Sequence, residues 1–174
     1  MTDTIERPRL KITYATLRND NEELHEQFER GMDKARAQLG KHYPNFINGE
    51  PRPGEGEFED RSPIDEGLVL GFFAKGTRQD AKDAIAAARA AFPGCRDTPW
   101  QDRVAIMRRA AAIISERQME LAALMVLEVG KNRLEALGDV EETADFFRYY
   151  SDRMAEKDGF MEKHGVQVKI LGDL

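Results

Sequence analysis

The sequence predicts an α/β segment that is rich in helices, and three features of the chain support this fold class. Residues 19–39 carry charges and a few apolar residues at helical spacing. Residues 42–76 are rich in glycine and proline and contain short β-prone pieces, which favours strands and turns. From Thr77 onward, apolar residues recur at helical spacing almost to residue 154. The length of 174 residues is that of one ordinary domain.

The composition excludes several classes of partner. With 26 basic and 32 acidic residues the formal net charge is −6, whereas nucleic acid or an anionic membrane requires a basic surface. The single cysteine, Cys95, excludes an internal disulfide framework or a zinc cluster and fits a reducing compartment. The N-terminus has no apolar segment typical of a secretory signal, and the longest apolar stretch, near 121–127, is far too short to cross a bilayer. We therefore expect a cytoplasmic protein with no nucleic-acid or membrane partner.

The first predicted helix covers residues 19–39, with Asp20 as its cap and Gly40 as its end. Its apolar residues form one narrow stripe, so the helix must pack on another element. The stripe consists of Leu24, Phe28, Met32, Ala35 and Leu39. Residues 1–17 have no clear period and are expected to be an extended arm. Residues 1–40 are thus an N-terminal arm and helix, followed by a second unit over residues 41–174.

Short strands are predicted at 46–48 and 68–73, and another near 166–171. Asn48-Gly49 is a hairpin turn signal. Ser62-Pro63 and Glu66-Gly67 indicate further turns between the strands.

The next helix begins at a capping box formed by Thr77 and Asp80, and Pro93-Gly94 is expected to end it. Thr98 is the predicted N-cap of the helix that follows, with Pro99 at its first position.

Two more predictions concern the long helical stretch that follows. Residues 98–129 are expected to bend near Ser115, and a last helix to run from about Arg133 to Met154. The predicted core stripes are Val104, Met107, Ala111 and Ile114 in the first, and Leu137, Val140, Ala144 and Phe147 in the second.

Gly130-Lys131 follows an apolar run and raises the question of a phosphate-binding loop. Such a loop needs a glycine five residues before its Gly-Lys and a Ser or Thr after it, but Met125 and Asn132 occupy those places. The better interpretation is that Gly130 ends one helix in the left-handed conformation and Asn132 begins the next.

Two further groups of residues are weak candidates for chemistry. The acids Glu141, Glu142 and Asp145 share helix faces, but no histidine lies nearby, so a solvated acidic face is favoured over a metal site. Cys95 has only Arg96 beside it to lower its thiol pKa and no neighbouring histidine to act as base, so it is not assigned as a nucleophile.

Two long stretches resemble the aldehyde dehydrogenase superfamily. "NFINGE" with "RSPIDEGLVLGFFAKGTRQDAKDAIAAARAAF" is similar to the opening β-layer and first helix of its nucleotide-binding domain. "PWQDRVAIMRRAAAIISERQMELAALMVLEVGKNRLEALGDVEETADFFRYYSDRM" is similar to the next two helices, and the resemblance covers about residues 44–157. It implies the N-terminal segment of that fold, with an incomplete cofactor-binding domain over residues 41–174.

Two details resemble one branch of the superfamily. Asn132 follows Gly130-Lys131 where most members have proline, and "GKHYPNFINGE" follows an N-terminal helix. Both are typical of the 1-pyrroline-5-carboxylate (glutamate-γ-semialdehyde) dehydrogenases of proline degradation. The resemblance implies NAD as the cofactor of the full-length enzymes, which are usually homo-oligomers.

The departures from the family limit what this chain is expected to do. The family's cofactor lysine, glycine-rich helix start, base glutamate and nucleophilic cysteine all belong to motifs that do not occur here, and Cys95 does not match the nucleophile. We therefore expect no catalytic, cofactor-binding or metal-binding residue and no activity from the chain alone. Its expected partner is the remainder of the enzyme or a full-length homologue. The alternatives are a non-catalytic helical binding or assembly module and a gene fragment without function.

The resemblance also suggests substrate-passage residues. In the family the helix matching 133–154 lines the route to the catalytic thiol. The matching positions here are Gly138, Asp139, Glu142 and Phe146, with Tyr149 as a further position. A carboxylate at Glu142 suits a substrate that carries an α-ammonium group. Packing of these side chains in a core is the alternative explanation for the pattern.

Overall fold

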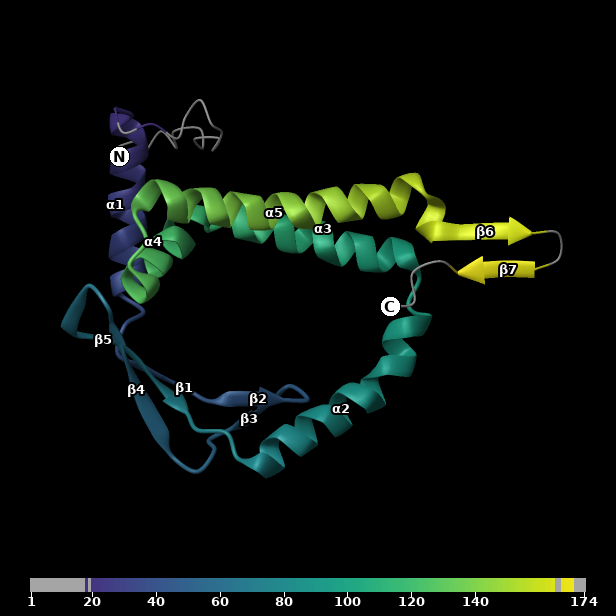
Figure 1. The fold of residues 1–174 in the computed structure, drawn as a ribbon, viewed down its shortest axis with the longest axis horizontal. Helices are drawn as coiled ribbons and strands as arrows, with labels where there is room; N and C mark the ends of the chain where they lie inside the picture. Colours follow the sequence, from purple (N-terminus) through teal and green to yellow (C-terminus); the bar gives the residue numbers. More distant parts are fainter. Residues whose placement is uncertain (1–17, 19, 165–166, 171–174) are drawn as a thin grey trace, which may run out of the picture.

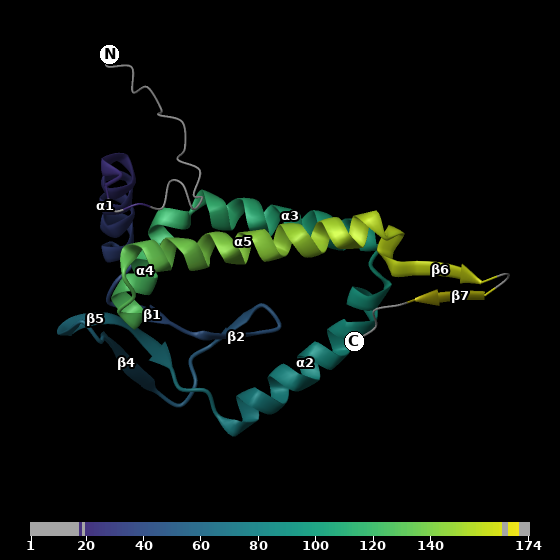
Figure 2. The same ribbon diagram turned by 45° about the horizontal axis from the view of Figure 1, so that its top comes forward.

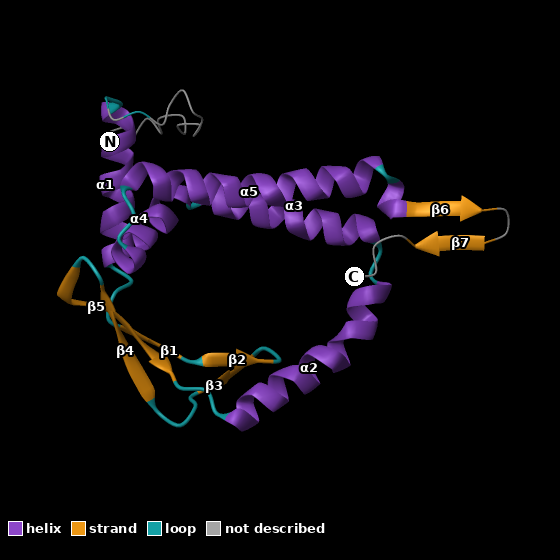
Figure 3. Ribbon diagram, viewed as in Figure 1, coloured by secondary structure: helices purple, strands orange, loops and turns teal. Residues whose placement is uncertain are grey.

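A computed structural model describes residues 18, 20–164 and 167–170, with side-chain burial described as far as residue 160. The described residues form five α-helices, one short 3₁₀ helix and seven short strands (Figures 1 and 3). The elements are α1 (Glu22–Arg36), β1 (Lys41–Tyr43), β2 (Asn45–Ile47), β3 (Glu50–Arg52), β4 (Glu57–Ser62), β5 (Asp65–Ala74), α2 (Arg78–Asp97), α3 (Trp100–Glu116), α4 (Gln118–Val129), α5 (Arg133–Glu156), η1 (Asp158–Phe160), β6 (Met161–His164) and β7 (Gln167–Ile170). This is the predicted helix-rich α/β segment.

Helices α1, α4 and α5 share the main hydrophobic core at one end of the molecule. Its buried members are Leu24, Phe28, Ala35, Leu70, Ala122, Ala123, Leu127, Ala136, Leu137 and Val140. The predicted stripe of the first helix is confirmed, because its two remaining members, Met32 and Leu39, pack against this core. At Gly31 the backbone of α1 approaches α4 so closely that an added Cβ would lie 2.6 Å from the carbonyl carbon of Met119.

The ends predicted for α1 were wrong at both termini. Asn21, not Asp20, is the cap, and its Oδ1 accepts a hydrogen bond of 3.1 Å from the Leu24 N–H. The Asp20 carboxylate is instead engaged by Arg18 at 2.7 Å. The helix ends at Arg36. Gly40, in a left-handed conformation, then donates its N–H to the Leu70 carbonyl oxygen and leads into β1.

The β-layer contains a three-stranded sheet of order β1-β5-β4 and a separate β2–β3 hairpin. The predicted hairpin turn is confirmed, since Asn48 and Gly49 have φ angles of 53° and 78°. The turn predicted at Glu66-Gly67 is wrong, because both residues lie inside β5. The turn predicted at Ser62-Pro63 is confirmed, since the chain turns at Pro63 and Ile64, between β4 and β5. The strand predicted near 166–171 is β7, which pairs with β6 over its described residues.

The boundary between α2 and α3 also differs from the prediction. α2 continues through Pro93-Gly94 to Asp97, because a proline removes only one helical donor and Gly94 does not adopt the left-handed conformation that would end the helix. Thr98 is not an N-cap: its hydroxyl donates back to the Gly94 carbonyl oxygen at 2.9 Å. Pro99 precedes α3 without a side-chain cap. The bend expected near Ser115 is confirmed as a break at Arg117 between α3 and α4.

Helices α3 and α5 lie side by side and antiparallel, with α1 and α4 at one end of the pair and β6–β7 at the other (Figures 1 and 2). Val104 and Ala111 of α3 are buried, as predicted, but Met107 is 44% exposed. In α5 the predicted stripe is buried except for Phe147, which is half-buried. Among the described residues no helix is both long and apolar enough to cross a membrane.

Candidate functional site

The Gly130-Lys131 pair is a helix end, as predicted. Gly130 has a φ of 71° and terminates α4 in the left-handed conformation. Asn132 then caps α5, and its Oδ1 accepts a hydrogen bond of 3.0 Å from the Glu135 N–H. Ser62 of β4 donates from Oγ to the Leu127 carbonyl oxygen at 2.5 Å and satisfies one of the last carbonyls of α4.

None of the five described α-helices begins at the glycine-rich turn of a usual pyrophosphate site. A pyrophosphate site of the usual kind needs free backbone N–H groups at a glycine-rich helix start. Here the side chains of Asn21, Thr77 and Asn132 already accept hydrogen bonds from the first turns of α1, α2 and α5, respectively. α3 begins at Trp100, after Pro99, and α4 begins at Gln118, both without a side-chain cap. We assign no cofactor-binding residue within this part of the chain.

Several acids on α5 form ion pairs with basic residues. Asp139 pairs with Lys131. The Lys131 ammonium contacts Asp139 Oδ2. The hydrogen bond to Asp139 raises the pKa of Lys131, and the opposing effect of partial burial is smaller. Both side chains are more than one-third exposed, so this pair stabilises the fold only weakly.

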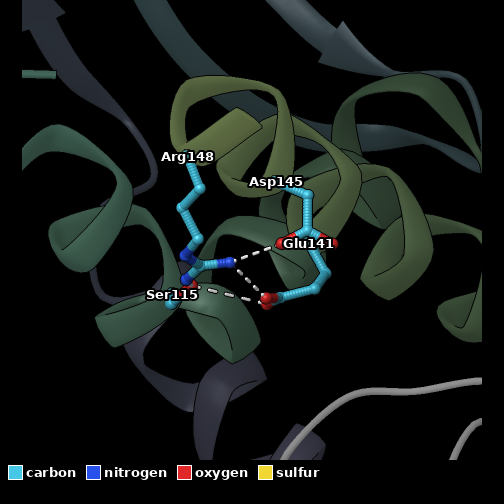
Figure 4. Close-up of polar contacts among 4 residues, drawn as sticks. All are labelled: Ser115, Glu141, Asp145 and Arg148. Atoms are coloured by element: carbon cyan, nitrogen blue, oxygen red, sulfur yellow. Dashed lines mark hydrogen bonds and ion pairs between the residues drawn. The ribbon is translucent and has the colours of Figure 1, made fainter. Parts of the chain in front are cut away.

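Arg148 gathers two more acids into a cluster that joins α5 to the end of α3 (Figure 4). Its Nη1 donates to Glu141 Oε1 at 2.8 Å and to Asp145 Oδ1 at 2.7 Å. Its Nη2 contacts the Ser115 hydroxyl, which in turn lies 3.4 Å from Glu141 Oε2. Burial lowers the pKa of Arg148, but the hydrogen bonds to Glu141 and Asp145 outweigh it, and the pKa lies above its ordinary value.

This cluster gives the acids of α5 a structural purpose. Arg148 forms ion pairs with both Glu141 and Asp145, so its single positive charge is shared between two carboxylates. Within residues 18–160, apart from residue 19, no group of three or more His, Cys, Asp or Glu side chains is arranged to hold a metal ion.

Glu142 differs from its neighbours on α5. Glu142 is exposed, and its carboxylate has no hydrogen bond or ion pair within the described part of the chain. Asp139, Glu141 and Asp145 each form an ion pair with a basic side chain, so Glu142 is the one carboxylate between residues 139 and 145 without an ion pair to a described residue. Such a group is available for an external cation.

An apolar groove of about 410 Å³ runs between α3 and α5, in the C-terminal half of α5. Its lining residues are Arg103, Val104, Met107, Phe146, Phe147, Tyr150, Ser151 and Met154. Phe146 therefore lines a cavity, whereas Glu142 and Tyr149 lie outside its lining. The rings of Phe146 and Tyr150 are 6.3 Å apart between centroids, and both remain more than half exposed.

The sequence interpretation missed part of this groove. Arg103 of α3 was not singled out, Tyr150 of α5 was noted only as one of four neighbouring aromatic residues, and Met107 was assigned to the core. The available signal was the spacing of four between Phe146 and Tyr150, which places the two rings on one face of the helix.

The Ser151 hydroxyl in the groove wall is buried and has no hydrogen-bond partner among the described residues.

Asp139, Glu142 and Phe146 are separated by three and four residues and share one side of α5. Gly138 begins this strip, and Tyr149 extends it by one turn. The strip thus presents one unpaired carboxylate one turn before an aromatic groove.

Cys95 was expected in a loop after Pro93-Gly94. It lies instead in the last turn of α2. It is exposed and not in a disulfide. Its neighbour Arg96 donates from Nε to the Asp97 carboxylate at 2.7 Å.

Comparison with known proteins extends this picture. The aldehyde dehydrogenase family model matches residues 51–169. The chain is 38% identical over 131 residues to 1-pyrroline-5-carboxylate dehydrogenase 2 of Bacillus subtilis, covering 75% of this chain and 25% of that protein. A 1-pyrroline-5-carboxylate dehydrogenase of Staphylococcus aureus is 35% identical over 131 residues, which are 75% of this chain and 26% of that protein.

Solved structures agree with these relatives. A crystal structure of 1-pyrroline-5-carboxylate dehydrogenase from Thermus with bound NAD superposes with a TM-score of 0.75 at 34% identity, covering 88% of this chain and 29% of that one. Proline utilization A from Bdellovibrio bacteriovorus superposes with a TM-score of 0.77 at 26% identity, covering 91% of this chain and 17% of that one. The chain spans about a quarter of the length of the relatives it matches in sequence. It belongs to the aldehyde dehydrogenase family.

Proposed function

We propose that this chain is the first part of an NAD-dependent 1-pyrroline-5-carboxylate dehydrogenase, which oxidises glutamate γ-semialdehyde to glutamate in proline degradation in the cytoplasm. The names of its relatives support the reaction, and the bound NAD in the Thermus structure supports the cofactor. In this proposal residues 1–40 contribute helix α1, and residues 41–174 are the first part of the cofactor-binding domain. The arm predicted for residues 1–17 lies outside the described residues.

The observation that carries the substrate assignment is the uncompensated charge of Glu142. Opening of the pyrroline ring by water yields an aldehyde that bears an α-ammonium group. An exposed carboxylate without a basic partner attracts that cation, whereas Asp139 and Glu141 are already paired with Lys131 and Arg148. Phe146 then supplies an apolar surface one turn further along α5 for the aliphatic part of the substrate.

We assign the catalytic thiol, the base and the NAD site to residues outside these 174. The starts of α1, α2 and α5 are capped by side chains, and Cys95 lies on α2 rather than on α5, which carries the proposed strip. The chain alone is therefore inactive, and activity requires the rest of the enzyme.

A fusion tests this proposal directly. This chain replaces the matched part of the Bacillus subtilis relative, and oxidation of 1-pyrroline-5-carboxylate is followed by NADH absorbance. We expect turnover by the fusion and none by the 174-residue chain. Turnover by the chain alone, or a fusion that folds but oxidises only other aldehydes, would contradict the proposal.

Two neighbouring acids provide a matched pair of variants in the fusion. We expect Glu142→Gln to lower kcat/KM about 10-fold for glutamate γ-semialdehyde, because the interaction with the ammonium group is lost. For 5-oxopentanoate, which lacks the ammonium group, the change should stay within about 2-fold. Glu141→Gln should affect the two aldehydes alike, since Glu141 is bonded to Arg148. Equal loss for both aldehydes in Glu142→Gln would remove Glu142 from the substrate site.

A second candidate function is a non-catalytic helical binding or assembly module. The exposed apolar residues of α2, such as Ile85 and Phe92, favour it. This candidate predicts that the chain binds a complete relative, and that the fusion described above is inactive. Light scattering of the chain mixed with the complete Bacillus subtilis relative separates the two functions.

A further inference from the structure

The chain leaves helix α5 through a left-handed turn. Asp158, Gly159 and Phe160 follow one another with φ angles of 49°, 73° and 56°. Glycine adopts this conformation freely and aspartate tolerates it, but it is strained for a bulky side chain such as that of Phe160. A hydrogen bond of 3.0 Å from the Phe160 N–H to the Lys157 carbonyl oxygen closes the turn. Strained backbone of this kind persists only where neighbouring groups hold it in place.

The neighbouring group is the indole ring of Trp100. Trp100 is the first residue of α3, and because α3 and α5 are antiparallel, the start of α3 lies next to the end of α5 (Figure 1). A Cβ atom added to Gly159 would lie 2.7 Å from both Cγ and Nε1 of the indole, so the ring occupies the space that a side chain would need. The ring of Trp100 and the backbone of Gly159 are therefore packed against each other.

The turn decides in which direction the β6–β7 pair points. β6 begins at Met161, directly after Phe160, and pairs with β7. In both ribbon views the two strands extend beyond the end of the α3–α5 pair (Figures 1 and 2). A two-stranded unit is at best marginally stable on its own, so its direction depends on the residues that attach it. Left-handed values at residues 158–160 end the helix and turn the chain into β6, whereas right-handed values would continue the helix.

We propose that Trp100 is a latch for the β6–β7 pair. Its ring packs on Gly159 and keeps residues 158–160 in the left-handed conformation, which fixes the two strands relative to α3 and α5. When the ring moves away, the turn relaxes toward ordinary backbone angles and the strands change direction. Trp100 is thus a positioning residue for the β6–β7 pair, and this role does not depend on the reaction proposed above.

Distances between two spin labels test the latch. In the 174-residue chain the only cysteine is replaced by serine (Cys95→Ser), and labels are attached through Ala112→Cys on α3 and Lys163→Cys in β6. We expect one narrow distribution of distances. Trp100→Ala should broaden it at least about 2-fold, because local order at the turn is lost. Ile106→Ala removes an exposed apolar side chain from the same helix and should leave the distribution unchanged.

A double-mutant cycle tests the contact between Trp100 and Gly159 itself. The Phe160 amide reports on the turn by its hydrogen exchange, because its N–H is bonded within the turn. Trp100→Ala and Gly159→Ala should each raise its exchange rate about 10-fold. The double variant should exceed either by less than about 3-fold, because the turn has already relaxed once one partner is lost. Independent effects would multiply to about 100-fold and would overturn the proposal.

The fluorescence of Trp100 gives a separate readout, because it is the only tryptophan of the chain. The ring is half-buried, and in Gly159→Ala the new methyl group should push it into water and shift its emission to longer wavelength. Gly40→Ala is the matched control. Gly40 has a similar φ of 70°, but nothing lies within 4 Å of the added carbon, so the emission should stay that of the wild type.

Circular dichroism shows whether each variant keeps its helices. If Trp100→Ala does not, Gly159→Ala in the labelled chain provides the same comparison, since it leaves α3 unchanged. If the 174-residue chain does not fold by itself, the exchange of the Phe160 amide is measured in the fusion described above. An unchanged distance distribution in a folded Trp100→Ala or Gly159→Ala variant would refute the latch, and so would equal broadening by Ile106→Ala.

Discussion

The guanidinium group of Arg133 lies over the ring of Phe28, with its central carbon 4.7 Å from the ring centroid. Arg133 is the first residue of α5, and Phe28 is the largest fully buried side chain of α1. The same guanidinium donates to Glu29 at 2.9 Å. These two contacts connect the start of α5 to α1, although Arg133 and Glu29 are 104 residues apart in the sequence.

The first prediction concerns this contact. Replacing Arg133 by alanine should lower the free energy of unfolding by about 1–2 kcal/mol, because the partly desolvated cation–π contact and the bond to Glu29 are both lost. Arg153→Ala is the control, because its guanidinium lies 5.4 Å from the ring of Tyr149, which is exposed. That change should cost less than about 0.5 kcal/mol in urea unfolding. Equal losses of unfolding free energy in the two variants would show that the contact with Phe28 stabilises the fold no more than an exposed one.

Two glycines in helices should respond to alanine with opposite signs. In Gly31→Ala the new methyl group would lie 2.6 Å from the Met119 backbone, so α1 and α4 must separate. We expect a loss of about 1–3 kcal/mol. In Gly138→Ala nothing lies within 4 Å of the added carbon, and the helix should gain about 0.5–1 kcal/mol. Thermal unfolding of both variants decides the matter, and stabilisation by Gly31→Ala would contradict the close crossing of α1 and α4.

Ser62→Ala tests the connection between the β-layer and α4. The Ser62 hydroxyl is buried and bonded to the Leu127 carbonyl oxygen, which loses its side-chain donor in the variant. We expect about 1–3 kcal/mol of destabilisation. Thr143→Val removes a similar hydroxyl-to-carbonyl bond to Asp139 at an exposed position, so its effect should be much smaller. Denaturant titration of both proteins makes the comparison.

The start of α2 should depend on pH through Asp80. The Thr77 N–H and, second, its hydroxyl donate to the Asp80 carboxylate and hold its pKa below the ordinary value of 3.8. The stabilisation from a lowered pKa is complete above the unfolded value of about 3.9 and is lost as the pH falls through the folded value. The helical signal of α2 should therefore be constant from neutral pH to about 5 and decline below about 4.

Nuclear magnetic resonance titration of the Asp80 carboxyl measures this directly. Thr77→Ala removes the hydroxyl donor, so the pKa of Asp80 should move back toward 3.8. Thr98→Ala is the control, because its hydroxyl bonds only to the end of α2 at Gly94. An Asp80 pKa that is the same in the wild type and in Thr77→Ala would contradict the capping box.

Much of the fold could be predicted because its signals are local. The Asn48-Gly49 turn, the capping box at Thr77 and the helix end at Gly130 each depend on a few adjacent residues, and all three are present. Two of the predictions that failed involved competition for one side chain. Asp20 binds Arg18 instead of capping α1, and the Thr98 hydroxyl bonds backward to α2 instead of forward to α3.

The candidate site shows the same division. The acids and aromatic residues of α5 could be named from their spacing and from the family resemblance, but their partners could not. Arg148 donates to Glu141 and also contacts Ser115, which lies 33 residues away in the sequence. The pairing of Glu141 is therefore part of a contact between α5 and α3. The groove beside Phe146 needs α3 as its second wall, and no helical period within α5 contains that information.

The sequence by itself determined the class of the fold and nearly every helix, because hydrophobic periodicity and short capping motifs act within one element. The family was recognised separately, from the resemblance of two long stretches to the aldehyde dehydrogenases. Only the tertiary structure decided which carboxylate is left without a partner, where α3 and α5 form a groove, and that the apolar face of α2 is uncovered. These properties depend on distances between elements far apart in the chain, and such distances are set by packing rather than by local sequence.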